Sequence, residues 1–215
     1  MTRTLIFDTE TTGKASWGAP LSAQPYLVQI ALQLIDDETG RALGHFSAVT
    51  VPEFKGDRVN ISAEVQKIHG IGDAEVEKFG LDYKFVAPVF SNFARRADRI
   101  VAHNSDFDSL ILLAMFSRIA FPQEHVRNTP LVCTMRTLMP QLKIPARYPK
   151  PNDPYAFVSL QKAHMWAKNP YDWEEGVGFE DAHDAMNDVD ATALVWRAII
   201  ENEVPLVQRQ WPGSV

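Results

Sequence analysis

The chain has 215 residues, of which 46% are hydrophobic and 22% are charged, and its formal net charge is −6. This length and composition fit a single α/β domain spanning residues 1–215. The single cysteine, Cys133, excludes an internal disulfide framework and a cysteine-rich zinc site, and favours a cytoplasmic protein. The negative charge argues against a large basic groove for duplex DNA, although bound cations would still allow a nucleic-acid substrate. No segment resembles a signal peptide or a membrane span, so no membrane association is expected.

The first fifty residues are predicted to form three strands. Leu5–Glu10 is a short apolar run that ends in acidic residues. Apolar residues alternate with Gln29 and Gln33 along Tyr26–Ile35, which is typical of a strand covered on one side. A polar turn then leads to Leu43–Val51, which completes a hairpin.

Helical patterns dominate the remainder of the chain. They cover Ser62–Ile68, Tyr83–Ala97, Phe107–Ile119, Ser159–Ala167 and Asp184–Ile200. The short apolar strand Ile100–Ala102 lies between two of these helices. An antiparallel meander followed by alternating strands and helices indicates an α/β fold with a mixed sheet and helices on its faces.

The segment Pro140–Pro154 contains five prolines together with basic residues and tyrosines. Because proline lacks an N–H group and fixes φ, this segment is predicted to be a loop. It is either a plain surface connection or a basic, aromatic rim that contacts phosphates and bases.

Asp8 and Glu10 lie two residues apart in the first strand and therefore point to the same face. Adjacent carboxylates repel each other, and their burial without a partner is costly. A divalent metal ion is the simplest compensation. The alternative is a solvated strand face close to the turn at Thr12 and Gly13.

The acidic segment His103–Asp108 follows the strand Ile100–Ala102, and such strand ends commonly carry sites in α/β folds. Ser105 and Asp108 have the spacing of a helix capping box. Asp106 is expected to stabilise the helix N-terminus. For Asp108, a capping role and a functional role are both open.

The segment His183–Thr192 opens an amphipathic helix and contains three aspartates. His183 is expected just before this helix, because it could not share a helical face with Asp188. Asp184, Asp188 and Asp190 cannot all be metal ligands, and their spacing does not choose between them.

Three ordered segments resemble the motifs of the DEDDh 3′–5′ exonucleases, a DnaQ-like group. The segments are Phe7–Gly13, His103–Asp108 and His183–Asp188. The resemblance implies a ribonuclease H-like fold with a five-stranded mixed sheet. It also implies two Mg²⁺ or Mn²⁺ ions, with His183 as general base and the following four ligands: Asp8, Glu10, Asp108 and Asp188.

The resemblance extends to substrate contacts. Thr11 and Thr12 would bind the terminal 3′-hydroxyl, although turn chemistry is an equally good explanation for both residues. His69 and Asn104 would contact the terminal nucleotide. Phe107 would be either a wedge against the last base or, as is more common at such a position, a core residue.

The expected activity is release of nucleoside 5′-monophosphates from single-stranded 3′ ends, with DNA favoured. RNA ends, short oligonucleotides and an inactive nucleic-acid-binding module are the alternatives. The intact acidic set and His183 argue against an inactive module. A homodimer and an association with a polymerase stay open, but the short tail Glu201–Val215 favours a free-standing exonuclease.

Overall fold

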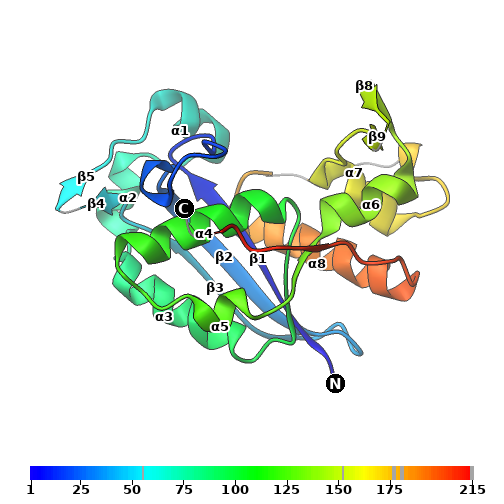
Figure 1. The fold of residues 1–215 in the computed structure, drawn as a ribbon, viewed down its shortest axis with the longest axis horizontal. Helices are drawn as coiled ribbons and strands as arrows, with labels where there is room; N and C mark the ends of the chain where they lie inside the picture. The colour runs from blue at the N-terminus through cyan, green and yellow to red at the C-terminus, as the bar shows by residue number, and fades with distance from the viewer. Residues whose placement is uncertain (55, 152, 176–177, 180–181, 214–215) are drawn as a thin grey trace.

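A computed structural model describes residues 1–54, 56–151, 153–175, 178–179 and 182–213, and a mixed sheet forms its centre (Figure 1). The sheet has six strands in the order β10-β7-β6-β1-β2-β3. They are β1 (Arg3–Thr11), β2 (Leu27–Asp36), β3 (Ala42–Val49), β6 (Arg99–Ala102), β7 (Leu131–Cys133) and β10 (Gln208–Arg209). The strands β1, β6 and β7 are parallel, whereas β2, β3 and β10 are antiparallel to their neighbours. The predicted mixed sheet is confirmed, and β10 adds a sixth, two-residue strand at its edge.

Helices cover both faces of the sheet (Figure 1). One face is covered by α3 (Tyr83–Ala94), α4 (Ser105–Arg118) and α5 (Glu124–Arg127). The other is covered by α6 (Thr134–Leu142), α7 (Leu160–Lys168) and α8 (Ala185–Glu201). Phe7 of β1 is buried in the first core and Ile6 in the second, as alternation along a strand requires. β2 is also buried on both faces, so the prediction of one-sided cover is wrong, because α8 packs across the face that carries Gln29 and Gln33.

Several shorter elements complete the chain. They are β4 (Glu53–Phe54), β5 (Asp57–Arg58), α1 (Ala63–His69), α2 (Asp73–Phe79) and two 3₁₀ turns, η1 (Leu21–Ala23) and η2 (Trp173–Glu175). The predicted helix at Ser62 is α1, where the Ser62 hydroxyl accepts a hydrogen bond from the backbone N–H of Val65. Among the described residues, no helix has both the length and the apolar character needed to cross a bilayer.

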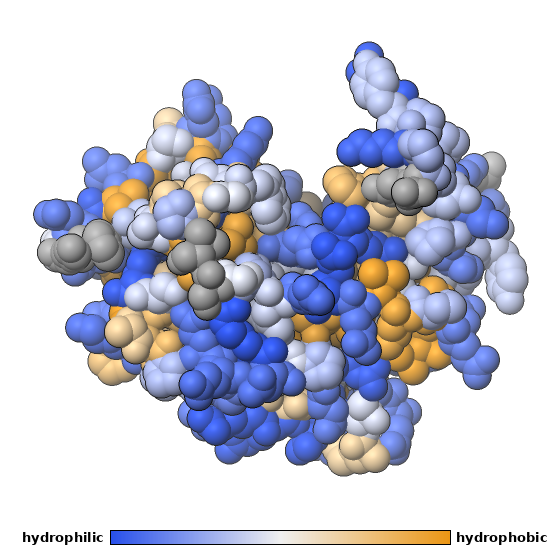
Figure 2. Space-filling view, viewed as in Figure 1, coloured by the Kyte–Doolittle hydropathy of each residue, from blue (hydrophilic) through white to orange (hydrophobic). Residues whose placement is uncertain are grey.

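The prediction of a loop over Pro140–Pro154 is wrong. Helix α6 continues through Pro140 to Leu142, and Pro140 lies in its last turn. Beyond the helix, β8 (Pro145–Lys150) and β9 (Asp153–Tyr155) form a separate two-stranded hairpin. A hairpin outside the main sheet tolerates proline because its edges do not require every N–H group. The β8–β9 hairpin projects from the body of the molecule (Figure 1), and the surface is hollowed beside it (Figure 2).

Candidate functional site

The acidic pair of β1 faces the helix α8. Asp8 and Glu10 have the same strand parity as Ile6, whose side chain belongs to the core beneath α8. Their antiparallel partners on β2 are Ala31 and Gln29. The small Ala31 leaves room beside Asp8, and Gln29 stands next to Glu10. The two carboxylates therefore lie side by side between the sheet and α8, as the sequence predicts.

Asp108 in the first turn of α4 is joined to β1 through Thr9. Its Oδ1 atom accepts a hydrogen bond of 3.1 Å from the Thr9 backbone N–H and one of 2.7 Å from the Thr9 hydroxyl. Because β6 is parallel to β1, the helix that follows β6 begins near the carboxyl end of β1. Asp108 is thus almost completely buried, with 3% of its surface exposed.

The predicted capping box at the start of α4 is wrong. The cap residue is Asn104, and its side chain makes no capping hydrogen bond. Ser105 is buried, and its hydroxyl has no hydrogen-bond partner among the described residues. Asp106 lies in the first turn of α4, as expected, and it also forms ion pairs with Arg136 at 3.3 Å and Arg209 at 2.8 Å. Both partners are distant in sequence, so local spacing could not reveal them.

The three aspartates of the α8 segment have different surroundings. Asp184 caps the helix, because its Oδ1 atom accepts hydrogen bonds from the backbone N–H groups of Met186 and Asn187. Asp190 is exposed and accepts a hydrogen bond from Gln33. Asp188 is 8% exposed, and its buried Oδ1 atom has no partner within the described part of the chain. Of the three, Asp188 is the one that faces the acidic pair of β1.

His183 precedes the cap of α8, as predicted, and its backbone has a φ of 72°. One ring nitrogen of His183 and single carboxylate oxygens of Glu10 and Asp188 all lie within 4.8 Å of one another. The imidazole is exposed, so water and ligands can reach it.

Burial and mutual repulsion raise the pKa of each carboxyl group in the cluster. The pKa of Glu10 rises to about 8, first through burial and then through Asp188 and Asp108. Burial also raises the pKa of Asp108 to about 7, although the hydrogen bonds from Thr9 oppose this rise. The pKa of Asp8 is raised well above its ordinary value, mainly by burial and then by Asp108 and Asp188. Burial raises the pKa of Asp188, whereas His183 lowers it.

A cation would relieve this repulsion. No lysine or arginine among the described residues forms an ion pair with any of the four carboxylates. The unpartnered Oδ1 atom of Asp188 shows that the site can accept a ligand. Carboxylate oxygens without a thiolate suit Mg²⁺ or Mn²⁺. The donor set therefore fits a divalent metal ion.

Two of the predicted substrate contacts, Thr11 and Thr12, lie where β1 ends, directly after Glu10. The Thr11 hydroxyl donates to the Gly13 carbonyl at 2.6 Å, and the Thr12 hydroxyl accepts from the Tyr26 N–H at 2.9 Å. These bonds are the turn chemistry that the sequence also allows. His69 Nε2 lies 3.3 Å from the Thr11 carbonyl oxygen, which attaches the end of α1 to the same turn.

His69 and Asn104 have different environments. Burial lowers the pKa of His69 and keeps its imidazole neutral, while its Nδ1 atom accepts the N–H of Ile71 at 3.1 Å. The neutral ring therefore donates from Nε2 to the Thr11 carbonyl. Asn104 lines a pocket at the carboxyl edge of the sheet. Phe107 packs against the core below α4, in agreement with the core alternative.

Two supporting residues were not identified from the sequence. Thr9 holds Asp108, and Gln29 holds the start of α8 through Asp184 and the backbone N–H of Ala185. The available signal was strand parity, because Thr9 points opposite to the acidic pair and Gln29 points to the same side as Glu10.

A mixed α/β sheet with clustered carboxylates at the end of its central strand is the arrangement of metal-dependent phosphodiester hydrolases. The RNase_T family, described as exonuclease, matches residues 5–196. The chain belongs to this family of DEDDh, DnaQ-like 3′–5′ exonucleases. The enzymes of this family are metal-dependent. No protein of curated function matches the sequence.

Solved structures share the fold at low sequence identity. The E. coli Exonuclease I complex with a dT13 oligonucleotide has a TM-score of 0.67 and 18% identity, and the match covers 93% of this chain but 41% of that one. The nuclease domain of 3′hExo, a DEDDh family member bound to rAMP, has a TM-score of 0.67 and 13% identity, with coverage of 98% and 97%. Exonuclease X in complex with 5′ overhanging duplex DNA has a TM-score of 0.56 and 21% identity, with coverage of 93% and 92%. These similarities support the ribonuclease H-like fold.

Proposed function

We propose that this protein uses two Mg²⁺ or Mn²⁺ ions to release nucleoside 5′-monophosphates from single-stranded 3′ ends, with DNA favoured over RNA. The observation that carries the proposal is the convergence of Asp8, Glu10, Asp108 and Asp188, whose pKa values are all raised and which no basic residue of the described chain neutralises. Ions bound there would supply an activated water and stabilise charge on the leaving oxygen.

His183 is the proposed general base. It is close to Glu10 and Asp188, exposed to solvent, and placed just before the helix rather than inside it. From this position the imidazole would accept the proton of the water that attacks the terminal phosphodiester. The oxygen of that water forms a new bond to phosphorus while the bond to the 3′ oxygen of the preceding nucleotide breaks, and that oxygen takes up a proton. Neighbouring Asp188 would stabilise the imidazolium that forms.

The four predicted substrate contacts would position the terminal nucleotide. The turn at Thr11 and Thr12 follows Glu10 directly, so its backbone groups lie beside the carboxylates. The hydrogen bond from His69 would fix this turn, and Asn104 would contact the nucleotide from the start of α4. An unpaired 3′ end fits best, because single strands can be splayed and stacked in a compact site.

RNA is the second candidate substrate, because the 3′hExo structure of similar fold is bound to rAMP. The preference for DNA draws support from the DNA complexes of Exonuclease I and Exonuclease X. A 2′-hydroxyl is the chemical feature that would distinguish the two polymers.

The test uses 5′-labelled single-stranded DNA and RNA of one sequence, incubated with Mg²⁺, with Mn²⁺ or with a chelator. The proposal predicts a ladder that shortens from the 3′ end, faster for DNA, with nucleoside 5′-monophosphate as the product. Asp8→Asn should abolish this ladder. The matched variant Asp190→Asn, which changes an exposed aspartate of α8 outside the cluster, should keep full activity.

Each other outcome has a definite meaning. If RNA is degraded faster than DNA, RNA is the favoured substrate. If neither polymer is degraded while both are bound, the protein is an inactive binding module and the proposed activity is wrong.

A further inference from the structure

A pocket of about 390 Å³ opens beside the carboxylate cluster. Its walls come from the loop after β1, the starts of α4 and α6, and the segment after β9. The lining residues are Trp17, Asn104, Asp106, Met135, Arg136 and Phe157. Since Asn104 and Met135 follow the ends of the parallel strands β6 and β7, the pocket lies at the carboxyl edge of the sheet, beside the four carboxylates. Its volume is in the range of ligand sites.

Two large aromatic side chains stand exposed on different walls of this pocket. Trp17 is 65% exposed and Phe157 is 60% exposed. The guanidinium of Arg136 lies 5.2 Å from the centre of the Phe157 ring. Exposed aromatic rings beside a cation are the platform on which proteins stack the bases of single strands.

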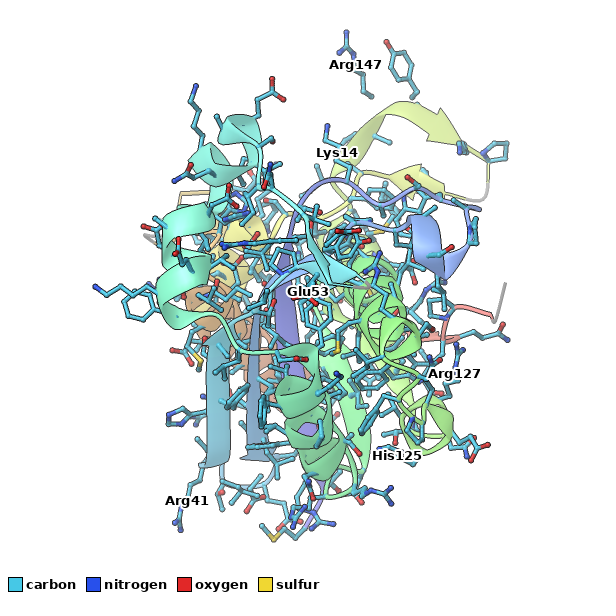
Figure 3. The ribbon with its side chains drawn as sticks, turned by 90° about the vertical axis from the view of Figure 1, so that its left-hand side faces the viewer. Lys14, Arg41, Glu53, His125, Arg127 and Arg147 are labelled. Atoms are coloured by element: carbon cyan, nitrogen blue, oxygen red, sulfur yellow. The ribbon has the colours of Figure 1, made fainter. Side chains whose placement is uncertain are left out.

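Further cations lie on the segments that adjoin the pocket, although the whole chain is acidic. Lys14 lies on the same loop as Trp17, and β8 carries Arg147 and Lys150. None of these three forms an ion pair in the described parts of the chain. Figure 3 shows Arg147 on the projecting hairpin, at the opposite end of the molecule from Arg41. Its guanidinium lies 5.4 Å from the ring centre of Tyr148, which is 78% exposed.

The acidic residue of the pocket does not oppose an anionic ligand. Asp106 is paired with both Arg136 and Arg209, so its charge is compensated within the protein. The exposure of Trp17 and Phe157 shows that the pocket is open to solvent. A flexible polyanion that carries aromatic bases matches these walls in charge and in chemistry.

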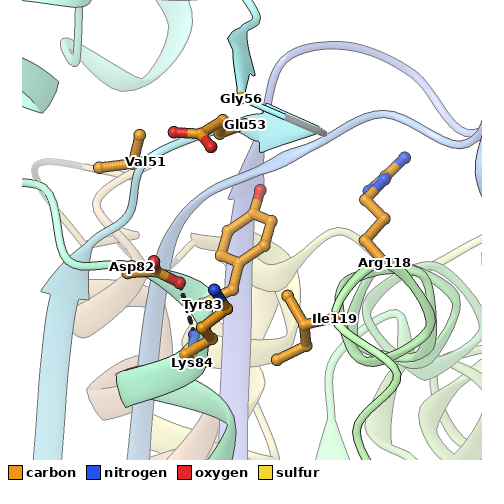
Figure 4. A pocket seen from close by; sticks show the side chains of 8 residues that line it. All are labelled: Val51, Glu53, Gly56, Asp82, Tyr83, Lys84, Arg118 and Ile119. Atoms are coloured by element: carbon orange, nitrogen blue, oxygen red, sulfur yellow. Dashed lines mark hydrogen bonds between the residues drawn. The ribbon is translucent and has the colours of Figure 1, made fainter.

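A second pocket, of about 340 Å³, does not offer this combination (Figure 4). Its lining includes the cations Lys84 and Arg118 but no exposed aromatic ring, since Tyr83 is 3% exposed. Arg118 is already used, because its guanidinium donates to the Pro25 carbonyl at 3.1 Å and lies 3.8 Å from the ring centre of Tyr26. Tyr83 donates its hydroxyl to the Leu27 carbonyl at 2.8 Å. These side chains hold the loop before β2 to α3 and α4.

We propose that the pocket beside the carboxylates binds the nucleotides that precede the terminal one, with Asn104 at the border between this pocket and the terminal nucleotide. Their bases stack on Trp17 and Phe157, and their phosphates contact Lys14, Arg147 and Lys150. The strand thus leaves the site between the loop after β1 and the β8–β9 hairpin. This inference rests on the proposed function, because it extends the same substrate away from its cleaved end.

The test measures kcat/KM for single-stranded substrates from two to twelve nucleotides long. The wild-type protein should favour the twelve-nucleotide substrate over the dinucleotide. In Trp17→Ala and Phe157→Ala this length advantage should fall by about 5-fold to 150-fold, which is the cost of losing one stacked base. In the double variant Arg147→Ala/Lys150→Ala, the slope of log affinity against log salt for the longer strand should shrink by about 1.4.

Two control variants distinguish the effect of changing the pocket from the general effect of a surface mutation. Phe85→Ala removes a 70% exposed ring on α3, and Arg41→Ala removes an exposed cation far from the hairpin (Figure 3). Both should keep the wild-type length advantage and salt dependence. Thermal unfolding of every variant shows that it is folded.

The outcomes distinguish this inference from the proposed function. If the wild type degrades the substrates but the Trp17 and Phe157 variants keep the wild-type length advantage, the inference is wrong and the exonuclease assignment stands. If the wild type degrades nothing, the same variants are compared by the fluorescence anisotropy of a labelled twelve-nucleotide strand. If these variants bind the labelled strand as tightly as the wild type, the inference is wrong. If they bind it more weakly, the inference is supported.

Discussion

At the scale of single residues, Thr9 shows how a neutral side chain organises the acidic cluster. It is 5% exposed and donates both its backbone N–H and its hydroxyl to one oxygen of Asp108. These hydrogen bonds lower the pKa of Asp108 against the effect of burial. Thr9 therefore keeps Asp108 oriented and ready to ionise, which is the usual role of groups that contact metal ligands.

Thr9→Val should weaken Mn²⁺ binding by roughly 10-fold to 100-fold, because Asp108 loses its orienting hydroxyl. It should also lower the free energy of unfolding by about 1–3 kcal/mol, the cost of leaving a buried acceptor without one donor. Calorimetric titration with Mn²⁺ and thermal unfolding measure the two effects. Thr4→Val is the matched control, because Thr4 lies on the same strand as Thr9 and its hydroxyl donates to Asp37 at 2.9 Å. It should lose stability without losing Mn²⁺ affinity, and equal affinity loss in both variants would contradict the role of Thr9.

His183 can be separated from the metal ligands by its backbone conformation. With a φ of 72°, the position is left-handed, and asparagine tolerates this conformation better than alanine. His183→Asn should lower kcat by roughly 100-fold to 10,000-fold, the usual contribution of a general base. Mn²⁺ affinity should stay unchanged in the calorimetric titration. A parallel loss of affinity would instead make His183 a metal ligand.

At the scale of elements, the candidate site depends on the contact between β2 and the start of α8. Gln29 donates to Asp184 at 3.2 Å and accepts the N–H of Ala185 at 3.1 Å. Asp184 in turn caps the helix. This contact sets where α8 begins, and hence where Asp188 and His183 lie relative to β1.

Gln29→Ala should lower both stability and activity, because the start of α8 loses one buried and one partly buried hydrogen bond. We expect a decrease of about 1–3 kcal/mol in the free energy of unfolding and a lower kcat. Gln33→Ala serves as the control, since its bond to the exposed Asp190 joins the same two elements farther from the site. It should cost less than about 1 kcal/mol and leave kcat unchanged. If both variants behave alike, Gln29 has no positioning role.

Elements with a clear hydrophobic period are predictable from the sequence, whereas elements stabilised by distant contacts are not. The strands β1 and β2 and the helices α3 and α8 follow their patterns closely. Helix α2 has a mostly exposed, charged surface with one buried residue, Val76, so its period is weak. The three-residue strand β7 is too short for any periodicity. The β8–β9 hairpin is not predictable, because its prolines indicate a loop. Its strand character becomes evident only when the two strands pair.

The acidic residues of the site show the same limit. The positions of Asp8 and Glu10 follow from strand parity alone. Capping by Asp184 is local, because it involves the next two or three residues. The choice between Asp188 and Asp190 requires the fold, because the burial of the first and the exposure of the second depend on tertiary packing. The proximity of Asp108 to β1 likewise depends on the parallel pairing of β1 with β6.

At the scale of the whole molecule, the carboxylate cluster links stability to pH. The pKa of Glu10 is about 8 and that of Asp108 about 7 in the folded protein, above the values of these groups in an unfolded chain. Between pH 7.5 and 8.5 the folded state therefore holds protons that the unfolded state has already released. The free energy of unfolding must then fall as the pH rises through this interval. Below about pH 7.5 the histidines whose pKa is lowered in the folded protein have the opposite effect, so the interval above pH 7.5 isolates the carboxylates. These histidines are His69, His103, His125 and His164.

Without divalent ions, the melting temperature should accordingly fall from pH 7.5 to pH 8.5. Saturating Mg²⁺ or Mn²⁺ should raise it more at pH 8.5 than at pH 6.5, because metal ligands must be deprotonated. At a hundred times the dissociation constant the gain is about 2.7 kcal/mol, or roughly 5–10 °C for a chain of this size. Glu10→Gln should flatten the pH dependence and reduce the gain from metal, while the exposed Glu64→Gln should change neither. Stability that rises with pH in the metal-free protein would show that the carboxylates do not repel one another in the folded state.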